Sequence, residues 1–310
     1  MAQRPHWLGE MVSPDIAVML RAAGISTSEV IQLIVNAVSE DLDGGVDVTT
    51  VATVPATQFS RIELTARAHG VVAGAVVAAA VFDLVSKQST TIEIVTPDGV
   101  EVKPGDVIIR SEGPTHALLT GERTALNILC HLSGIATVTA QWVKELEGTT
   151  AKVRDTRKTT PGMRKLEKYA VRCGGGVNHR MSLADAALIK DNHVVAAGGV
   201  VPAFEAVRKR FPEVPIEVEV DSLAQLEEVV TAGADLVLLD NFSVTQVKQA
   251  VDINKGRAKL EASGGLTLNV AREYAQTGVD FLAVGGITHS APILDIGADL
   301  FALPSHIGGE

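Results

Sequence analysis

Residues 216–240 read IEVEVDSLAQLEEVVTAGADLVLLD, which predicts a strand, a helix and a second strand in that order. The apolar runs at 216–220 and 235–239 have the length and the branched side chains of buried strands. The helical stretch between them begins at Leu223–Glu228. A strand–helix–strand unit of this kind predicts neighbouring parallel strands joined by a crossover helix.

The same alternation occupies the chain after residue 150. Expected strands lie at 151–155, 185–189, 216–220, 235–239, 258–262 and 280–284. Polar or glycine residues stand at the end of every strand, whereas a doubly wound sheet would gather its ligand groups at one switch point. We therefore expect an incomplete (β/α) barrel of about six strands.

The chain before residue 120 has a different texture. Strand-like segments at 61–67, 91–95 and 106–110 are separated by turn signals, and helices are expected at 27–39 and 72–86. These elements predict an N-terminal α+β sandwich domain over residues 1–120, with the tail 291–310 packing back on it. A long apolar helix from Thr120 to about Glu147 would begin a catalytic domain over 121–290. The predicted class is α/β.

Composition restricts the kind of function. The 310-residue chain has a formal charge of -10, with 46% hydrophobic and 4% aromatic residues, and its pI is near 5.3. An acidic chain with few aromatic residues does not suit a nucleic-acid groove. The longest apolar stretch, Val71–Phe82, is too short to span a membrane and predicts a buried helix. Cys130 and Cys173 provide no disulfide framework, which favours the cytoplasm.

A basic segment stands out against this acidic background. Nine of the 29 residues from Lys152 to Arg180 are Lys or Arg, and only two are acidic. Residues at expected strand ends and in glycine-rich turns predict a site for a small, highly anionic ligand. These residues are Arg157, Lys158, His179, Arg180 and Lys190. For Arg164, Lys165 and Lys168, a solvated amphipathic helix over Met163–Val171 is the preferred interpretation.

Acids and glycines follow the later strands. Glu219 and Asp240 suit ribose hydroxyls or a Mg²⁺ ion that keeps water and substrate phosphates as its other ligands, although salt bridges to nearby lysines would also explain them. The turns Ser263–Gly264–Gly265 and Gly285–Gly286 suit a phosphate, because glycine leaves backbone N–H groups accessible. There is no P-loop motif. The combination implies a sugar phosphate and additional carboxylates.

Ordered motifs then give a family resemblance. The segments are DTRKTTPG at 155–162, GGGVNHR at 174–180, KDNH at 190–193, EVEVD at 217–221, LLDNF at 238–242, EASGG at 261–265 and THS at 288–290. Over residues 27 to 300 the chain resembles the quinolinate phosphoribosyltransferase family. The resemblance implies a sandwich domain with an incomplete barrel. It also implies conversion of quinolinate and phosphoribosyl pyrophosphate to nicotinate mononucleotide, pyrophosphate and CO₂, with Mg²⁺ as cofactor, in de novo NAD biosynthesis.

The resemblance also assigns roles. Arg157, His179, Arg180 and Lys190 would bind the quinolinate carboxylates, Lys158 would serve the pyrophosphate side, and Ser263, Gly264, Gly285 and Gly286 would hold the 5-phosphate. Lys158, Lys190, Glu219 and Asp240 form the expected catalytic set, and Glu219 and Asp240 the expected Mg²⁺ ligands. Arg123 would reach the neighbouring subunit's site, which implies a homodimer or a larger assembly. Family members commonly carry Ala at position 286, and Met1–Ser26 has no assigned counterpart.

Three alternatives remain at the level of sequence. The first is a related phosphoribosyltransferase for another pyridine or pyrimidine acid. The second is a barrel lyase or isomerase acting on a phosphorylated sugar acid, with Lys190 or His179 as its base. The third is a non-catalytic sensor, which retention of Glu219 and Asp240 disfavours. His116, His131 and His289 are left without a role.

Overall fold

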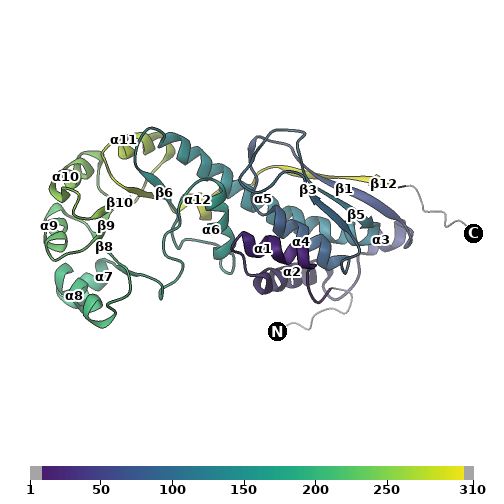
Figure 1. Cartoon of the computed structure of the whole chain (residues 1–310), viewed down its shortest axis with the longest axis horizontal. Helices are drawn as coiled ribbons and strands as arrows, with labels where there is room; N and C mark the ends of the chain where they lie inside the picture. Colours follow the sequence, from purple (N-terminus) through teal and green to yellow (C-terminus); the bar gives the residue numbers. More distant parts are fainter. Residues whose placement is uncertain (1–8, 304–310) are drawn as a thin grey trace, which may run out of the picture. The chain divides into compact units, whose positions relative to one another are not determined.

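The computed structural model describes residues 9–303 and divides the chain into two compact units (Figure 1). Unit 1 contains the residues up to 137, residues 165–174 and the residues from 291 onward. Unit 2 contains residues 138–164 and 175–290. Helix α5 (Thr115–Glu145) contributes to both units and runs unbroken through residue 120, where the sequence had suggested a domain boundary.

Unit 1 is built on an antiparallel four-stranded sheet in the order β12-β1-β5-β3. Strand β12 comes from the C-terminal tail and pairs with β1 along the whole of its length. The strands are β1 (Phe59–Ala66), β3 (Thr91–Ile94), β5 (Val107–Pro114) and β12 (Ile296–Ala302), and a separate pair is formed by β2 (Gly70–Val71) and β4 (Glu101–Val102). The helices are α1 (Pro14–Ala22), α2 (Thr27–Leu42), α3 (Val48–Thr53), α4 (Ala75–Val85) and the larger part of α6 (Arg164–Cys173).

Helix α4 is the centre of the unit 1 core. All of its residues are buried, with Phe82 and Leu84 completely inaccessible to solvent. The predicted buried helix is therefore confirmed, although its first residues belong to β2 and the connection after it. Among the described residues no single helix has the length and apolarity to cross a membrane, and only the sharply bent pair α1 and α2 passes that test when its members are taken together.

Unit 2 is a parallel six-stranded sheet in the order β6-β11-β10-β9-β8-β7. From β7 to β11 the strands follow chain order, and the first strand, β6, pairs with the last, β11. This order is a ring open between β6 and β7, so the predicted incomplete barrel is confirmed. The strands are β6 (Lys152–Arg154), β7 (Ala187–Ile189), β8 (Ile216–Val220), β9 (Leu236–Asp240), β10 (Lys259–Ser263) and β11 (Phe281–Ala283).

Helices cover the outer side of this barrel, as Figure 1 shows for α8, α9 and α10. Val218, Val237 and Leu260 are buried to 1% exposure or less, and the alternate positions on the same strands face the barrel interior. The unit 2 helices are α7 (Asp191–Ala197), α8 (Val200–Arg210), α9 (Leu223–Thr231), α10 (Val244–Asn254), η1 (Leu268–Val270), α11 (Ala271–Ala275) and α12 (Gly286–His289).

The expected solvated helix over residues 163–171 is only partly correct. Lys165 is 66% exposed and pairs with Glu29 at 2.6 Å, but Lys168 is fully buried in α6. Arg164 donates to the carbonyl oxygen of Met181 and to Thr159 Oγ1 rather than facing solvent. Periodicity located the helix, but it did not show that Lys168 would be buried.

Candidate active site

The interior of the unit 2 barrel opens into a cavity of about 570 Å³ at the carboxyl ends of its strands. Alternate strand positions supply its wall, because side chains in a strand point to opposite faces in turn. Most of the predicted site residues of this unit lie here: Arg157, Lys158, His179, Arg180, Lys190, Glu219, Asp240, Ser263 and Gly264. Leu188, Leu238, Glu261 and Ala283 complete the wall from within the strands.

One side of the cavity is strongly cationic. Arg157 and Arg180 both line it, and burial and then the charge of Arg157 lower the pKa of Arg180. Arg180 is fixed through Nη1, which donates to the Ala186 carbonyl oxygen at 3.0 Å. The Nε atoms of Arg157 and Arg180 are buried without a hydrogen-bond partner. Arginines placed together in this way are suited to binding an anion with more than one acidic group.

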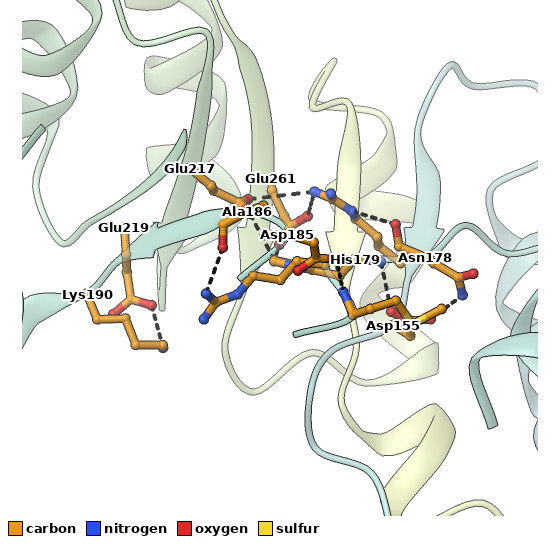
Figure 2. Close-up of polar contacts among 12 residues, drawn as sticks. Asp155, Asn178, His179, Asp185, Ala186, Lys190, Glu217, Glu219 and Glu261 are labelled. Atoms are coloured by element: carbon orange, nitrogen blue, oxygen red, sulfur yellow. Dashed lines mark hydrogen bonds and ion pairs between the residues drawn. The ribbon is translucent and has the colours of Figure 1, made fainter. Parts of the chain in front are cut away.

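His179 lines the same cavity as these arginines. Its Nδ1 accepts a hydrogen bond from the backbone N–H of Arg180 at 2.7 Å, and its Nε2 lies 2.9 Å from Glu217 Oε2. The backbone N–H of His179 donates to Asp155 Oδ1. Both ring nitrogens are thus engaged within the protein, and the Asp155 carboxylate holds the loop that carries the imidazole (Figure 2).

Glu219 and Asp240 also line the cavity. Lys190 Nζ and Glu219 Oε2 form an ion pair at 2.9 Å, visible in Figure 2. Burial and then the charge of Glu219 raise the pKa of Asp240, which places the two carboxylates within electrostatic reach of each other. From the sequence, a metal or ribose role and a salt bridge to lysine are alternatives for these two acids. For Glu219 the salt bridge is present in the structure.

Backbone geometry explains the first glycine turn. Gly264 adopts φ +98°, and a Cβ there would lie 2.1 Å from Asn241 Oδ1. Asn241 itself has φ +57°, and its backbone N–H donates to the Ser263 carbonyl oxygen at 2.8 Å. Its side-chain amide donates to Asp240 Oδ2 at 2.8 Å. Asn241 therefore ties the acid on β9 to the turn after β10, a link that the sequence analysis did not identify.

The second glycine turn lies beside Lys158. A Cβ on Gly285 would come within 3.0 Å of Lys158 Cδ and 3.3 Å of His289 Nε2. Thr288 Oγ1 donates to the Lys158 carbonyl oxygen at 2.8 Å. His289, left without a role by the sequence analysis, is therefore adjacent to two predicted site residues. His116 and His131 make contacts within unit 1, to the Val54 carbonyl oxygen and to Glu167.

A layer of charged residues lies deeper in the barrel. Arg154 Nη1 is 2.6 Å from Glu261 Oε2 and 3.7 Å from Glu217 Oε1. Figure 2 shows Glu217, Glu261 and His179 converging. The sequence analysis quoted both glutamates in motifs without assigning them. Strand alternation could have identified both as site residues. Side chains two residues apart point to the same face of a strand, so Glu217 faces the same way as Glu219, and Glu261 the same way as Ser263.

Arg123 is not among the residues that line this cavity. It lies on α5 in unit 1, in a hollow of about 500 Å³ lined only by unit 1 residues, among them Arg67, Glu122, Asn127 and Asp295. That Arg123 reaches the site of a neighbouring subunit remains a prediction.

Comparison with known proteins agrees with this architecture. The C-terminal domain model of quinolinate phosphoribosyl transferase matches residues 135–299, and the N-terminal domain model matches residues 47–133. The chain is 53% identical to the nicotinate-nucleotide pyrophosphorylase (carboxylating) of Mycobacterium leprae, over 85% of this chain and 94% of that protein. It is 39% identical to the human protein of the same name, over 78% of this chain and 83% of that one.

Solved structures match over nearly the whole chain. NadC from Streptococcus pyogenes superposes with a TM-score of 0.86 at 38% identity, covering 90% of this chain and 99% of that one. The nicotinate-nucleotide pyrophosphorylase of Ehrlichia chaffeensis superposes with a TM-score of 0.83 at 39% identity, covering 89% and 99%. With both domain models matched in order, the chain belongs to the quinolinate phosphoribosyltransferase family of pentosyltransferases.

Proposed function

We propose that this enzyme transfers the phosphoribosyl group of phosphoribosyl pyrophosphate to the ring nitrogen of quinolinate. The product then loses CO₂, leaving nicotinate mononucleotide and pyrophosphate, a step of de novo NAD biosynthesis. The observation that carries this proposal is one cavity lined by two arginines, by two carboxylates and by a glycine turn. These residues are Arg157, Arg180, Glu219, Asp240 and the turn Ser263–Gly264–Gly265. Relatives named nicotinate-nucleotide pyrophosphorylase support it.

The cationic side would bind quinolinate. Arg157 and Arg180 each offer a planar fork to a carboxylate, and Lys190 adds a point charge. His179 would act as a positioning residue, because its ring nitrogens already contact Arg180 N–H and Glu217. A dicarboxylate matches two adjacent arginines better than the single carboxylate of nicotinate does.

The carboxylates and the glycine turns would bind the phosphoribosyl donor. The Ser263–Gly264–Gly265 turn and the Gly285–Gly286 turn offer backbone N–H groups to the 5-phosphate, and Lys158 would serve the pyrophosphate. Glu219 and Asp240 fit Mg²⁺, because they supply oxygen donors and their mutual repulsion would fall beside a divalent cation. When bound with the substrate phosphates, Mg²⁺ would neutralise charge on the departing pyrophosphate.

The chain's own residues would act mainly by position and charge. Fixed cations hold the ring nitrogen toward the ribose carbon, and Glu219 and Asp240 stabilise positive charge as the bond to pyrophosphate breaks. The alkylated pyridinium ring accepts the electron pair released with CO₂. No covalent nucleophile is required. Neither the contacts nor the comparisons support the lyase or isomerase alternative, and its candidate base Lys190 is paired with Glu219.

We also propose that the enzyme acts in the cytoplasm as a homodimer or larger assembly, with Arg123 completing the neighbouring subunit's site. This proposal rests on the family resemblance, and Arg123 itself lines a hollow formed by unit 1 residues.

The direct test is to incubate the purified protein with quinolinate, phosphoribosyl pyrophosphate and Mg²⁺. Nicotinate mononucleotide, pyrophosphate and CO₂ should appear in equal amounts, and EDTA should abolish all three. The Asp240→Asn variant, with a carboxamide in place of the proposed Mg²⁺ ligand, should lose turnover while still binding quinolinate. Wild-type protein that binds quinolinate but releases no pyrophosphate would refute the proposal.

A further inference from the structure

A charged layer lies where a barrel interior normally holds branched apolar side chains. The side chains of Glu261, Glu217 and Arg154 are 0%, 3% and 14% exposed. Burying such groups costs more than an apolar core of equal volume, so their presence here calls for a function. Glu261 also lines the catalytic cavity, which brings this layer into contact with the space that the substrates would occupy.

The charges in this layer do not balance if every carboxyl group is ionised. Glu217 and Glu261 are both buried, and they share one guanidinium group, that of Arg154. His179 adds no charge in the tautomer that its contacts indicate, with Nδ1 accepting from Arg180 N–H and Nε2–H directed at Glu217. Asp155 accepts from the His179 backbone N–H and from the Asn178 amide.

Two oxygen atoms of the layer lack hydrogen-bond partners. Glu217 Oε1 and Glu261 Oε1 are buried and accept no hydrogen bond. One oxygen of each glutamate and one ring nitrogen of His179 lie within 4.8 Å of one another. Two buried carboxylates this close repel each other, which favours a proton on one of them. Burial and then Glu217 raise the pKa of Glu261 well above its ordinary value, although Arg154 opposes the shift.

We propose that Glu261 is a carboxylic acid at neutral pH and donates the proton that replaces CO₂ on the substrate ring. This inference rests on the proposed function. After phosphoribosyl transfer, the bond between the ring carbon and the carboxylate breaks and its electron pair stays on that carbon, beside the alkylated nitrogen. The Glu261 O–H bond then breaks and its proton forms the new C–H bond. The Glu261 carboxylate is held by Arg154 until solvent returns the proton.

The other side chains at the cavity that carry protons are less suited to donate one to the ring carbon. The guanidinium groups of Arg157 and Arg180 do not release protons. Lys190 is paired with Glu219, and the N–H of His179 is directed at Glu217. Lys158 lies beside Gly285, at the end assigned to phosphate. Glu261 combines a stored proton with a place on the cavity wall.

The test is a single-turnover comparison of Glu261→Gln with wild type, in which pyrophosphate and CO₂ are followed separately. Wild type should release both together. Glu261→Gln should form pyrophosphate within about threefold of the wild-type rate, because phosphoribosyl transfer needs no proton from Glu261. Its CO₂ release and nicotinate mononucleotide formation should fall about 100-fold, the scale of lost general acid catalysis, while quinolinate mononucleotide accumulates. Glu261→Asp should recover part of the loss.

Several outcomes would overturn the proposal. Equal loss of pyrophosphate and CO₂ would mean that Glu261 is structural, and unchanged kinetics would mean that it is not the donor. A stoichiometric metal ion in wild type that Glu261→Gln lacks would make the cluster a metal site. Glu227→Gln, an exposed glutamate paired with Arg257, is the matched control and should behave as wild type.

A second measurement on wild type does not depend on the variant folding. Enzyme equilibrated in D₂O is mixed rapidly with substrates in H₂O, and the first-turnover product should carry more deuterium on the ring carbon than the mixed solvent supplies. Product that matches the solvent would count against a buried donor. Wild type that makes neither pyrophosphate nor CO₂ would instead refute the proposed function.

Discussion

At the scale of single residues, Arg157 and Arg180 share one wall of the cavity, and Arg157 is close enough to lower the pKa of Arg180. Arg180→Ala should raise the quinolinate KM about 10- to 100-fold, because a hydrogen bond between charged groups contributes about 1.5–3 kcal/mol. Steady-state kinetics with quinolinate as the varied substrate measure the effect, and thermal unfolding checks the fold.

A matched control comes from the same basic segment. Lys165 is 66% exposed and pairs with Glu29 on the surface of unit 1. Lys165→Ala should leave the quinolinate KM within about twofold, since surface ion pairs contribute little. Equal effects of Arg180→Ala and Lys165→Ala would show that net charge, rather than the paired arginines, attracts the substrate.

The two glycine turns make opposite predictions for the same substitution. A Cβ on Gly264 would meet Asn241 Oδ1 and backbone at φ +98°, whereas a Cβ on Gly286 would meet nothing within 4 Å. Gly264→Ala should therefore raise the KM for phosphoribosyl pyrophosphate about 5- to 150-fold, as strained backbone costs about 1–3 kcal/mol. Gly286→Ala introduces the residue that family members commonly carry, and it should leave that KM unchanged. A large effect of Gly286→Ala would contradict this geometry.

At the scale of secondary-structure elements, α5 passes unusually close to the segment before β12. A Cβ on Gly134 would lie 2.1 Å from the Pro292 carbonyl oxygen. Alanine stabilises a helix by about 1 kcal/mol relative to glycine, but forced overpacking typically costs about 1–3 kcal/mol and backbone cannot swing away. Gly134→Ala should therefore lower the free energy of unfolding, as measured by urea denaturation. A net gain would mean that α5 can move away from Pro292.

Sequence patterns predicted where the strands of unit 2 lie in the chain better than they predicted which strands pair. Branched apolar runs marked all six strands to within a few residues, because each strand is buried under helices on one side. The pairing of β6 with β11 joins the first strand to the last, and local sequence carries no signal for it. Strand β12 was not predicted, since residues 296–302 alternate weakly and gain their order by pairing with β1.

The sequence predicted the site residues at the strand ends, but not the buried charged residues elsewhere. Residues such as Lys190 and Asp240 follow strands, so the rule for parallel sheets brings them together. Lys168 appeared surface-exposed because helical periodicity does not reveal what packs against it, yet it is buried. The role of Glu261 depends on Arg154 and Glu217, which lie on different strands and meet only through the barrel.

At the scale of the whole molecule, Arg123 allows a test of whether the active site is shared between two subunits. If Arg123 completes a neighbouring subunit's site, Arg123→Ala and Arg157→Ala should each inactivate a homodimer. A heterodimer of the two variants would still contain one complete site, formed by Arg157 from one chain and Arg123 from the other. Random pairing makes half of the dimers mixed, so coexpression should restore about a quarter of wild-type activity.

Differently tagged chains allow the mixed dimers to be purified and their activity measured directly. The control pairs Arg157→Ala with Arg180→Ala. Both residues line the cavity of unit 2 within one chain, so this mixture has no complete site and should stay inactive. Recovery with Arg123→Ala but not with Arg180→Ala would establish the exchange, because only a residue supplied across the interface can be complemented. If purified mixed dimers of Arg123→Ala and Arg157→Ala stay inactive, Arg123 acts within its own chain.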